Sequence, residues 1–396
     1  MCNYFLMLGK KIKIDVDYLR PNSTFIYPLI SEDGDIVLPP RVALTAEKIN
    51  AIKARYGNIL YYNDNGQMAV IPSFRMQIAR NKSKEIMHEI AQSHKISKVA
   101  IHEAEKVIID IVNDLTSTEI LALNLLKDLK SYEEYIYNHS VNVGILSAVM
   151  ARMIGTFNKD EIKNIALGGY LHDIGQMQLD KNLLEKEGKY NITDIQKMKR
   201  HPQLGYETLK KIKDVHPIVL QSVLFHHERY NNNGYYGLPY ENLPIYPKII
   251  GLCDIYDALT SKRPFRSAIE PSNALKAILN AINQQFDYQL INIFINKLGP
   301  ILNNTQAFYT HNDICELNTQ ELAIIKDFGI NDMLKPKVII FCKFQRTGEQ
   351  LLARFYEKPL EIDLSQDPDN RYMIKIINNY KQLQSIQKKL EEKKLL

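Results

Sequence analysis

The sequence predicts a multidomain protein in which a central all-α domain lies between a small N-terminal α+β module and a small β-rich C-terminal module. Its 396 residues exceed the usual size of one domain. Apolar residues recur at helical spacing through the middle of the chain, whereas short strand-like runs bounded by turn residues occur near both ends. We expect modules over residues 1–75, 76–130 (a helical linker), 131–300 and 301–396.

The N-terminal module is predicted from short strands and one helix. Residues 11–16 alternate with period two, and residues 25–30 and 36–38 supply further strands. Thr45 is the expected N-cap of a short helix, after which residues 59–62 form a strand. This pattern shows no set of catalytic side chains.

The linker and the C-terminal module have different patterns. Residues 76–130 place apolar side chains at helical spacing among many lysines and glutamates, so we expect one or two helices, and a homodimer through them stays open. The last module contains strand-like runs at residues 313–317, 322–325 and 338–341, followed by a charged tail at 388–394.

Two segments of the central domain place polar side chains on apolar helix faces. His139 begins such a face, and a helix expected over residues 159–174 ends with the pair His172–Asp173. Gly168–Gly169 would allow a neighbouring helix to approach closely.

Three later segments do the same. His201–Pro202 opens a helix, since proline is tolerated in a first turn. His226–His227 ends another helix and precedes a loop rich in Gly, Asn and Tyr. Asp254 and Asp257 share one face with Ile250, and carboxylates on an apolar face need a cation, a hydrogen-bonding partner or a substrate donor.

These segments together predict a metal centre. A lone core histidine is more often hydrogen-bonded than metal-bound, but half of the ten histidines fall on core-facing or loop-entry positions of one helical domain. Five imidazoles and two carboxylates suit two octahedral divalent ions that share Asp173, with iron or manganese favoured by mixed nitrogen and oxygen ligands. The candidate ligands are His139, His172, Asp173, His201, His226, His227 and Asp254.

Composition limits the class of protein. A net charge of +5 from 50 basic and 45 acidic residues gives no reason to expect nucleic acid, and it suits an anionic small molecule. Four scattered cysteines without a CxxC pair indicate a reduced, cytoplasmic protein. No run approaches the roughly 18 apolar residues that a membrane span needs.

The motifs resemble those of the bacterial HD-GYP phosphodiesterases, a branch of the HD phosphohydrolases, so the central domain is expected to be of the HD type. Order and spacing agree over about residues 135–295. The matching stretches are His139-Ser140-Val141, Leu171-His172-Asp173-Ile174-Gly175, His201-Pro202, His226-His227-Glu228-Arg229, Gly234-Tyr235, Asp254-Ile255-Tyr256-Asp257-Ala258-Leu259-Thr260 and Arg263-Pro264-Phe265-Arg266.

The resemblance implies hydrolysis of cyclic di-GMP, or a related cyclic dinucleotide, to pGpG and in some members on to GMP. A metal-bridging hydroxide would attack the phosphorus in line. It also implies that the seven candidates above are ligands, with Asp173 and Gln176 catalytic. Substrate would contact Gln176, Tyr235, Asp257, Arg263 and Arg266, and the flanking modules would bind a regulatory ligand or a signalling protein.

Three departures from the family pattern keep alternatives open. Gln176 stands where the family usually has a lysine that touches a substrate phosphate, and the loop at 231–236 lacks an acid, a glycine and a proline of the family motif. Tyr135 stands where three-metal members have a glutamate, so we expect two metals. A weakened protein that serves as a cyclic-dinucleotide receptor is one alternative. The other is a nucleoside-phosphate hydrolase of the wider HD group, which would leave His226–His227, Tyr235 and the pair Arg263 and Arg266 unexplained.

Overall fold

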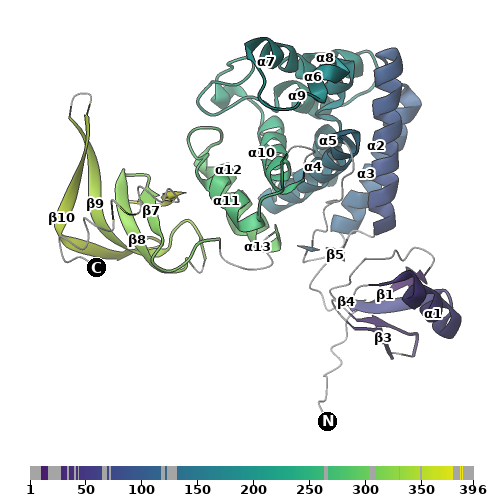
Figure 1. Cartoon of the computed structure of the whole chain (residues 1–396), viewed down its shortest axis with the longest axis horizontal. Helices are drawn as coiled ribbons and strands as arrows, with labels where there is room; N and C mark the ends of the chain where they lie inside the picture. The colour runs from purple at the N-terminus through teal and green to yellow at the C-terminus, as the bar shows by residue number, and fades with distance from the viewer. Residues whose placement is uncertain are drawn as a thin grey trace. The chain divides into compact units, whose positions relative to one another are not determined.

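The chain, seen here as a computed structural model, divides into two compact units, one of residues 1–79 with 109–124 and one of residues 80–108 with 125–396 (Figure 1). The four module boundaries expected from the sequence stay a prediction. The structure describes residues 10–16, 28–33, 35–39, 42, 44–64, 69–70, 73–116, 121–122, 132–262, 266–302, 308–329, 331–347, 350–377, 384 and 386.

The described residues between 10 and 64 form a small antiparallel sheet and one helix. Strands β1 (Lys10–Asp15), β2 (Leu29–Ile30), β3 (Ile36–Leu38) and β4 (Ile59–Asp64) are ordered β1-β4-β2-β3. Helix α1 (Ala46–Tyr56) begins at the predicted N-cap, where the Thr45 side chain accepts a hydrogen bond from the Lys48 amide. Leu29, Leu60 and Ile52 pack in a shared core, which confirms the α+β character of this region. Of the strand expected at 25–30, residues 25–27 lie outside the described part.

The region expected to be a helical linker contains two long helices. These are α2 (Ser73–Ser93) and α3 (Lys98–Thr116), flanked by the parallel two-stranded pair β5 (Ala69–Val70) and β6 (Leu121–Ala122). Lys82 of α2 forms an ion pair with Glu103 of α3 at 2.6 Å.

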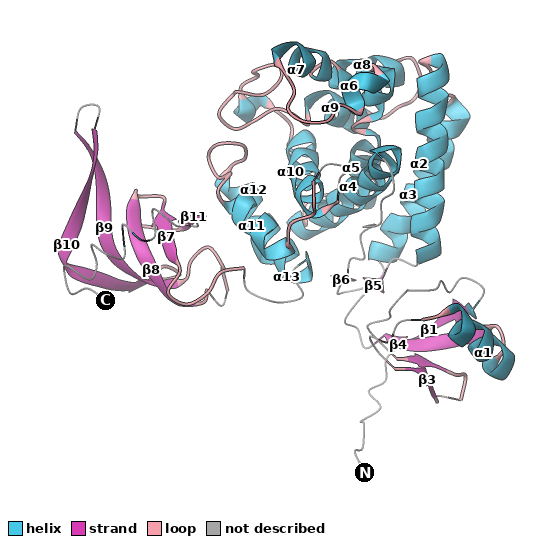
Figure 2. Cartoon of the chain, viewed as in Figure 1, coloured by secondary structure: helices cyan, strands magenta, loops and turns pink. Residues whose placement is uncertain are grey.

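The central part is all-α, as predicted (Figure 2). Its elements are α4 (Tyr132–Ile154), α5 (Lys159–Leu171), η2 (Ile174–Gln178), α6 (Lys181–Leu184), α7 (Ile192–Met198), α8 (His201–Lys210), α9 (Pro217–Phe225), η3 (Tyr240–Asn242), α10 (Ile245–Thr260), α11 (Pro271–Leu279), α12 (Tyr288–Ile293), the π-helical η4 (Phe294–Leu298) and α13 (Gly299–Leu302).

Helix α5 packs closely against α4. A capping box between Asn158 and Glu161 starts the helix. A Cβ atom on Gly169 would lie 3.0 Å from the Val143 carbonyl oxygen of α4, which bears out the close approach expected at the glycine pair. The helix ends at Leu171 rather than near residue 174, because the chain turns there into the 3₁₀ helix η2.

The C-terminal region is a five-stranded antiparallel sheet, which confirms its β-rich character. Strands β7 (Ile314–Leu317), β8 (Glu321–Asp327), β9 (Lys337–Thr347), β10 (Gln350–Asp363) and β11 (Met373–Ile376) are ordered β10-β9-β8-β7-β11. Phe341 and Leu322 lie in its core. The charged tail expected at 388–394 lies outside the described residues.

Candidate metal centre

Helix ends bring the predicted ligand residues together. His172 is the C-cap of α5, His201 is the first residue of α8, and His226 is the C-cap of α9. His139 lies within α4 and Asp254 within α10. The ligand atoms form two overlapping groups, and Asp173 belongs to both. The groups are His139, His172 and Asp173, and Asp173, His201, His226 and His227.

Two glycines allow these helix ends to meet. A Cβ atom on Gly175 would lie 1.9 Å from the carbonyl oxygen of His201, so η2 could not contact the start of α8 with any other residue there. A Cβ atom on Gly251 would lie 2.4 Å from the carbonyl oxygen of His226, and this places α10 against the end of α9. The segments that carry these candidate ligands therefore meet through direct backbone contact.

The carboxylate of Asp173 faces two different pairs of imidazoles. Its Oδ2 atom lies 3.2 Å from Nε2 of His172 and 3.8 Å from Nε2 of His139. Its Oδ1 atom lies 3.1 Å from Nε2 of His201 and 3.8 Å from Nε2 of His226. One carboxylate thus presents one oxygen to each pair, as a ligand that bridges two ions does.

The histidine tautomers fit a cation. Three imidazoles place Nδ1 within hydrogen-bonding distance of a backbone carbonyl, which can only accept, so in the neutral ring Nε2 carries the lone pair. These pairs are His172 with Gly169 at 2.7 Å, His201 with Met198 at 2.8 Å and His226 with Val223 at 2.9 Å. The Nε2 atoms of His201 and His226 are 3.3 Å apart. Two lone pairs at that distance repel unless a metal ion or a proton lies between them.

Buried polar atoms without partners support the same conclusion. Nε2 of His172 and Oδ1 of Asp173 are buried, and neither makes a hydrogen bond of acceptable geometry in the part of the chain that the structure describes. Such atoms are costly unless an ion or water satisfies them. The residues present therefore fit divalent metal ions.

Asp257 is placed differently from the expectation drawn from the resemblance. It is fully buried, and its Oδ2 atom accepts a hydrogen bond from Nδ1 of His139 at 2.7 Å. Its Oδ1 atom accepts a second bond from the Asn142 amide at 2.8 Å. The carboxylate thus contacts Nδ1 of the candidate ligand His139, a geometry that does not support the expected contact with the nucleotide.

Burial and neighbouring charges shift the pKa values of the site residues in different directions. Burial lowers the pKa of His139, but its hydrogen bonds with Asp254 and Asp257 outweigh burial and raise the pKa to about 10. Burial and neighbouring imidazoles lower the pKa of His226 to about 3. Burial opposes ionisation of Asp173, yet the nearby imidazoles outweigh it and hold its pKa well below the usual range. The Asp173 carboxylate is therefore ionised at neutral pH, as a metal ligand must be.

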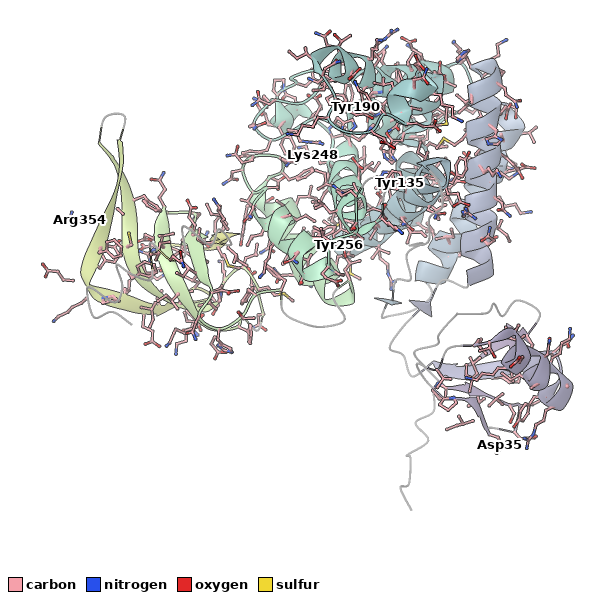
Figure 3. All side chains as sticks on the ribbon, in the orientation of Figure 1. Asp35, Tyr135, Tyr190, Lys248, Tyr256 and Arg354 are labelled. Carbon is pink, nitrogen blue, oxygen red and sulfur yellow. The ribbon has the colours of Figure 1, made fainter. Side chains whose placement is uncertain are left out.

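The aromatic side chains complete the site. Tyr235 stacks on the ring of His227 with a centroid distance of 4.2 Å, and burial raises the pKa of Tyr235 to about 12. Lys199, at the end of α7, lies with its Nζ atom 5.3 Å from the centroid of the Tyr235 ring. Tyr135 of α4, labelled in Figure 3, stacks on the ring of His139 with a centroid distance of 5.1 Å. It brings no carboxylate to the site.

Three other residues were predicted to contact the substrate. Gln176 is half-buried in η2, close after the candidate ligand pair His172–Asp173. Arg266 is exposed, and its guanidinium donates a hydrogen bond to the Ala258 carbonyl near the end of α10. Arg263 lies outside the described residues.

Three residues of the site were missed by sequence reasoning. Asn142 supports Asp257, Lys199 lies against Tyr235, and Glu228 holds the loop that follows the histidine pair. Asn142 could have been found because it lies one turn from His139 on the same helix, and Glu228 stands in the family-like stretch at 226–229, although that stretch did not reveal its role.

Comparison with known proteins finds similarity to one family. Residues 115–290 match the family described as HD domain, which confirms the resemblance seen in the sequence. A cyclic di-GMP phosphodiesterase of Pseudomonas aeruginosa, PA4108, is 30% identical over 59% of this chain and 55% of its own. The cyclic di-GMP phosphodiesterase response regulator RpfG of Xanthomonas campestris is 31% identical over 38% of this chain and 40% of its own. The 3'3'-cGAMP-specific phosphodiesterase 1 of Vibrio cholerae is 27% identical over 50% of this chain and 44% of its own.

The chain thus spans about half the length of these curated relatives. Among the helices that the structure describes, none has the length and apolar character required to cross a membrane.

Proposed function

We propose that the central domain is a metal-dependent phosphodiesterase that hydrolyses a cyclic dinucleotide, with cyclic di-GMP as substrate and linear pGpG as the first product. The position of Asp173, with one carboxylate oxygen toward each of two histidine pairs, carries this proposal. The names of the relatives support the substrate class, since they specify cyclic di-GMP or 3'3'-cGAMP.

The site residues would hold two divalent ions, and mixed nitrogen and oxygen donors favour iron or manganese. When bound, such ions activate water and neutralise the charge that develops on a phosphodiester. We assign ligand roles to the two groups around Asp173 together with Asp254, whose Oδ1 atom lies 3.2 Å from Nε2 of His139.

Other side chains would orient the substrate. A tyrosine ordinarily keeps its phenolic proton at neutral pH, and burial raises the pKa of Tyr235 further, so it can donate a hydrogen bond beside His227. The half-buried amide of Gln176 can donate to a phosphate oxygen without adding charge. Asp257 would act through His139, by holding its Nε2 atom toward the cluster.

A receptor without turnover is the second candidate, and Gln176 is the residue that favours it. A lysine brings both hydrogen bonds and a positive charge to an anionic phosphate, whereas glutamine supplies a hydrogen bond without any charge of its own. Such a protein would keep the metal ions and the nucleotide but hydrolyse slowly or not at all.

Turnover and metal content measured on the same sample test the proposal. The chain is purified without oxygen, its iron and manganese are quantified, and conversion of cyclic di-GMP is followed by chromatography. We expect pGpG from the wild type, none from Asp173→Ala, and unchanged turnover from Asp214→Asn, which alters an exposed carboxylate. Bound nucleotide without product would establish the receptor, and absence of both metal and binding would exclude both functions.

A further inference from the structure

A buried glutamate holds the loop that follows the histidine pair. Glu228 is 4% exposed, and its Oε1 atom accepts a hydrogen bond from the Tyr236 amide at 2.8 Å. Its Oε2 atom accepts another from the Leu238 amide, also at 2.8 Å. Both carboxylate oxygens are therefore used by the backbone of one loop, on either side of Gly237.

The loop is fitted to this carboxylate. A Cβ atom on Gly234 would lie 2.6 Å from Cα and 2.7 Å from Oε1 of Glu228, so the chain passes directly over the glutamate. Gly237 has a φ of +66°, which favours glycine, and the Asn232 side chain accepts a hydrogen bond from the Tyr240 amide at 3.1 Å. These contacts fix the path of the loop from both ends.

Tyr235 lies between the two points where the loop meets Glu228. Its neighbours are Gly234, which packs on the glutamate, and Tyr236, which donates to it. The Tyr235 ring stacks on His227, the residue immediately before Glu228. Glu228 therefore connects the candidate metal ligand His227 with the loop that carries Tyr235.

We propose that Glu228 is a positioning residue that holds Tyr235 against His227 and thereby forms the wall of the pocket that receives the nucleotide. The placement of Tyr235 follows from the hydrogen bonds alone, whereas its role toward a nucleotide rests on the proposed function. Glutamine at position 228 keeps the size of the side chain but has one acceptor oxygen and an NH₂ group, which cannot accept from the second loop amide. The loop then loses one of its two anchors.

Fluorescence measures the position of the loop without any need for turnover. The chain contains no tryptophan, so Tyr235→Trp creates a single reporter in it. We expect Glu228→Gln, in that background, to increase quenching by acrylamide and to shift the emission to longer wavelength. Glu361→Gln is the matched control, because Glu361 is an exposed carboxylate on β10 that forms an ion pair with Lys337 at 3.6 Å.

A second variant guards against misfolding at Glu228. Gly234→Ala leaves the carboxylate in place but forces the loop away from it, so it should increase quenching in the same direction. In the chain that retains Tyr235, both variants should raise KM for cyclic di-GMP about tenfold with a smaller change in kcat, the signature of lost substrate binding.

The outcomes separate the two proposals. If folded Glu228→Gln or Gly234→Ala, judged by circular dichroism, leaves quenching and KM unchanged, Glu228 does not position Tyr235. If the wild type neither binds nor hydrolyses the nucleotide, the proposed function fails, while the quenching result still decides whether Glu228 holds the loop.

Discussion

Replacement of Asp257 by alanine distinguishes a carboxylate that orients His139 from one that contacts the nucleotide. The two donors that face it, Nδ1 of His139 and the Asn142 amide, lie at 2.7 and 2.8 Å in a fully buried position. Alanine removes both acceptors and also the group that keeps the Nε2 lone pair of His139 directed toward the cluster.

The expected loss follows from these contacts. A buried donor left without its acceptor costs about 1–3 kcal/mol, so two donors cost about 2–6 kcal/mol of unfolding free energy. Removing the partner of a ligand histidine typically lowers metal affinity about 10–100-fold. Asp257→Asn should be milder, since its oxygen can accept from His139 while its NH₂ donates to Asn142 after that amide turns.

Metal affinity and substrate affinity are measured separately. Manganese affinity is determined by competition with a chelator, and unfolding is followed in urea with and without metal. Asp214→Asn is the control for a general change of charge. If Asp257→Ala binds manganese as tightly as the wild type and instead raises KM for cyclic di-GMP, the carboxylate serves the nucleotide and the positioning argument is refuted.

Three further predictions concern the same cluster. Hydrogen bonds outweigh burial and raise the pKa of His139 to about 10, so a metal ion must displace a proton from this ring at neutral pH. The affinity for the metal should therefore rise with pH until about pH 10. Calorimetry in buffers of different ionisation enthalpy should detect the released proton. Gly175→Ala should push η2 from His201, lower the unfolding free energy by about 1–3 kcal/mol or more and leave fewer than two ions per chain, as metal analysis would show. Gln176→Lys should increase kcat/KM for cyclic di-GMP about tenfold by adding a charged phosphate contact, and unchanged steady-state kinetics would speak against that role.

The helical domain and its ligand segments were accessible from the sequence, because both depend on local pattern. The period of apolar residues revealed the helices, and proline at position 202 marked the start of α8. Repeated histidines at predicted helix ends were informative jointly, whereas each alone was ambiguous. The glycine pair before the ligand pair correctly indicated a close contact between α4 and α5.

Features that depend on tertiary contacts could not be predicted from the sequence pattern. Asp254 and Asp257 were correctly placed on one helix, but which of them faces the cluster depends on how α10 meets α4. Glu228 had no periodic signal, since its partners are amides of a loop whose path the sequence does not reveal. The long strand β10 was missed because a register shift between Phe355 and Leu360 breaks its alternation.

Metal stoichiometry with electron paramagnetic resonance tests the central claim most directly, namely that Asp173 bridges two ions. The metal-free chain is titrated with Mn²⁺, and the spectrum is recorded at saturation for the wild type and for Asp173→Ala. Two ions per chain with an exchange-coupled signal, lost in the variant, is the result expected for ions held about 3.5–4 Å apart. One ion per chain, or two with the six-line signal of isolated Mn²⁺, would contradict the bridging role of Asp173.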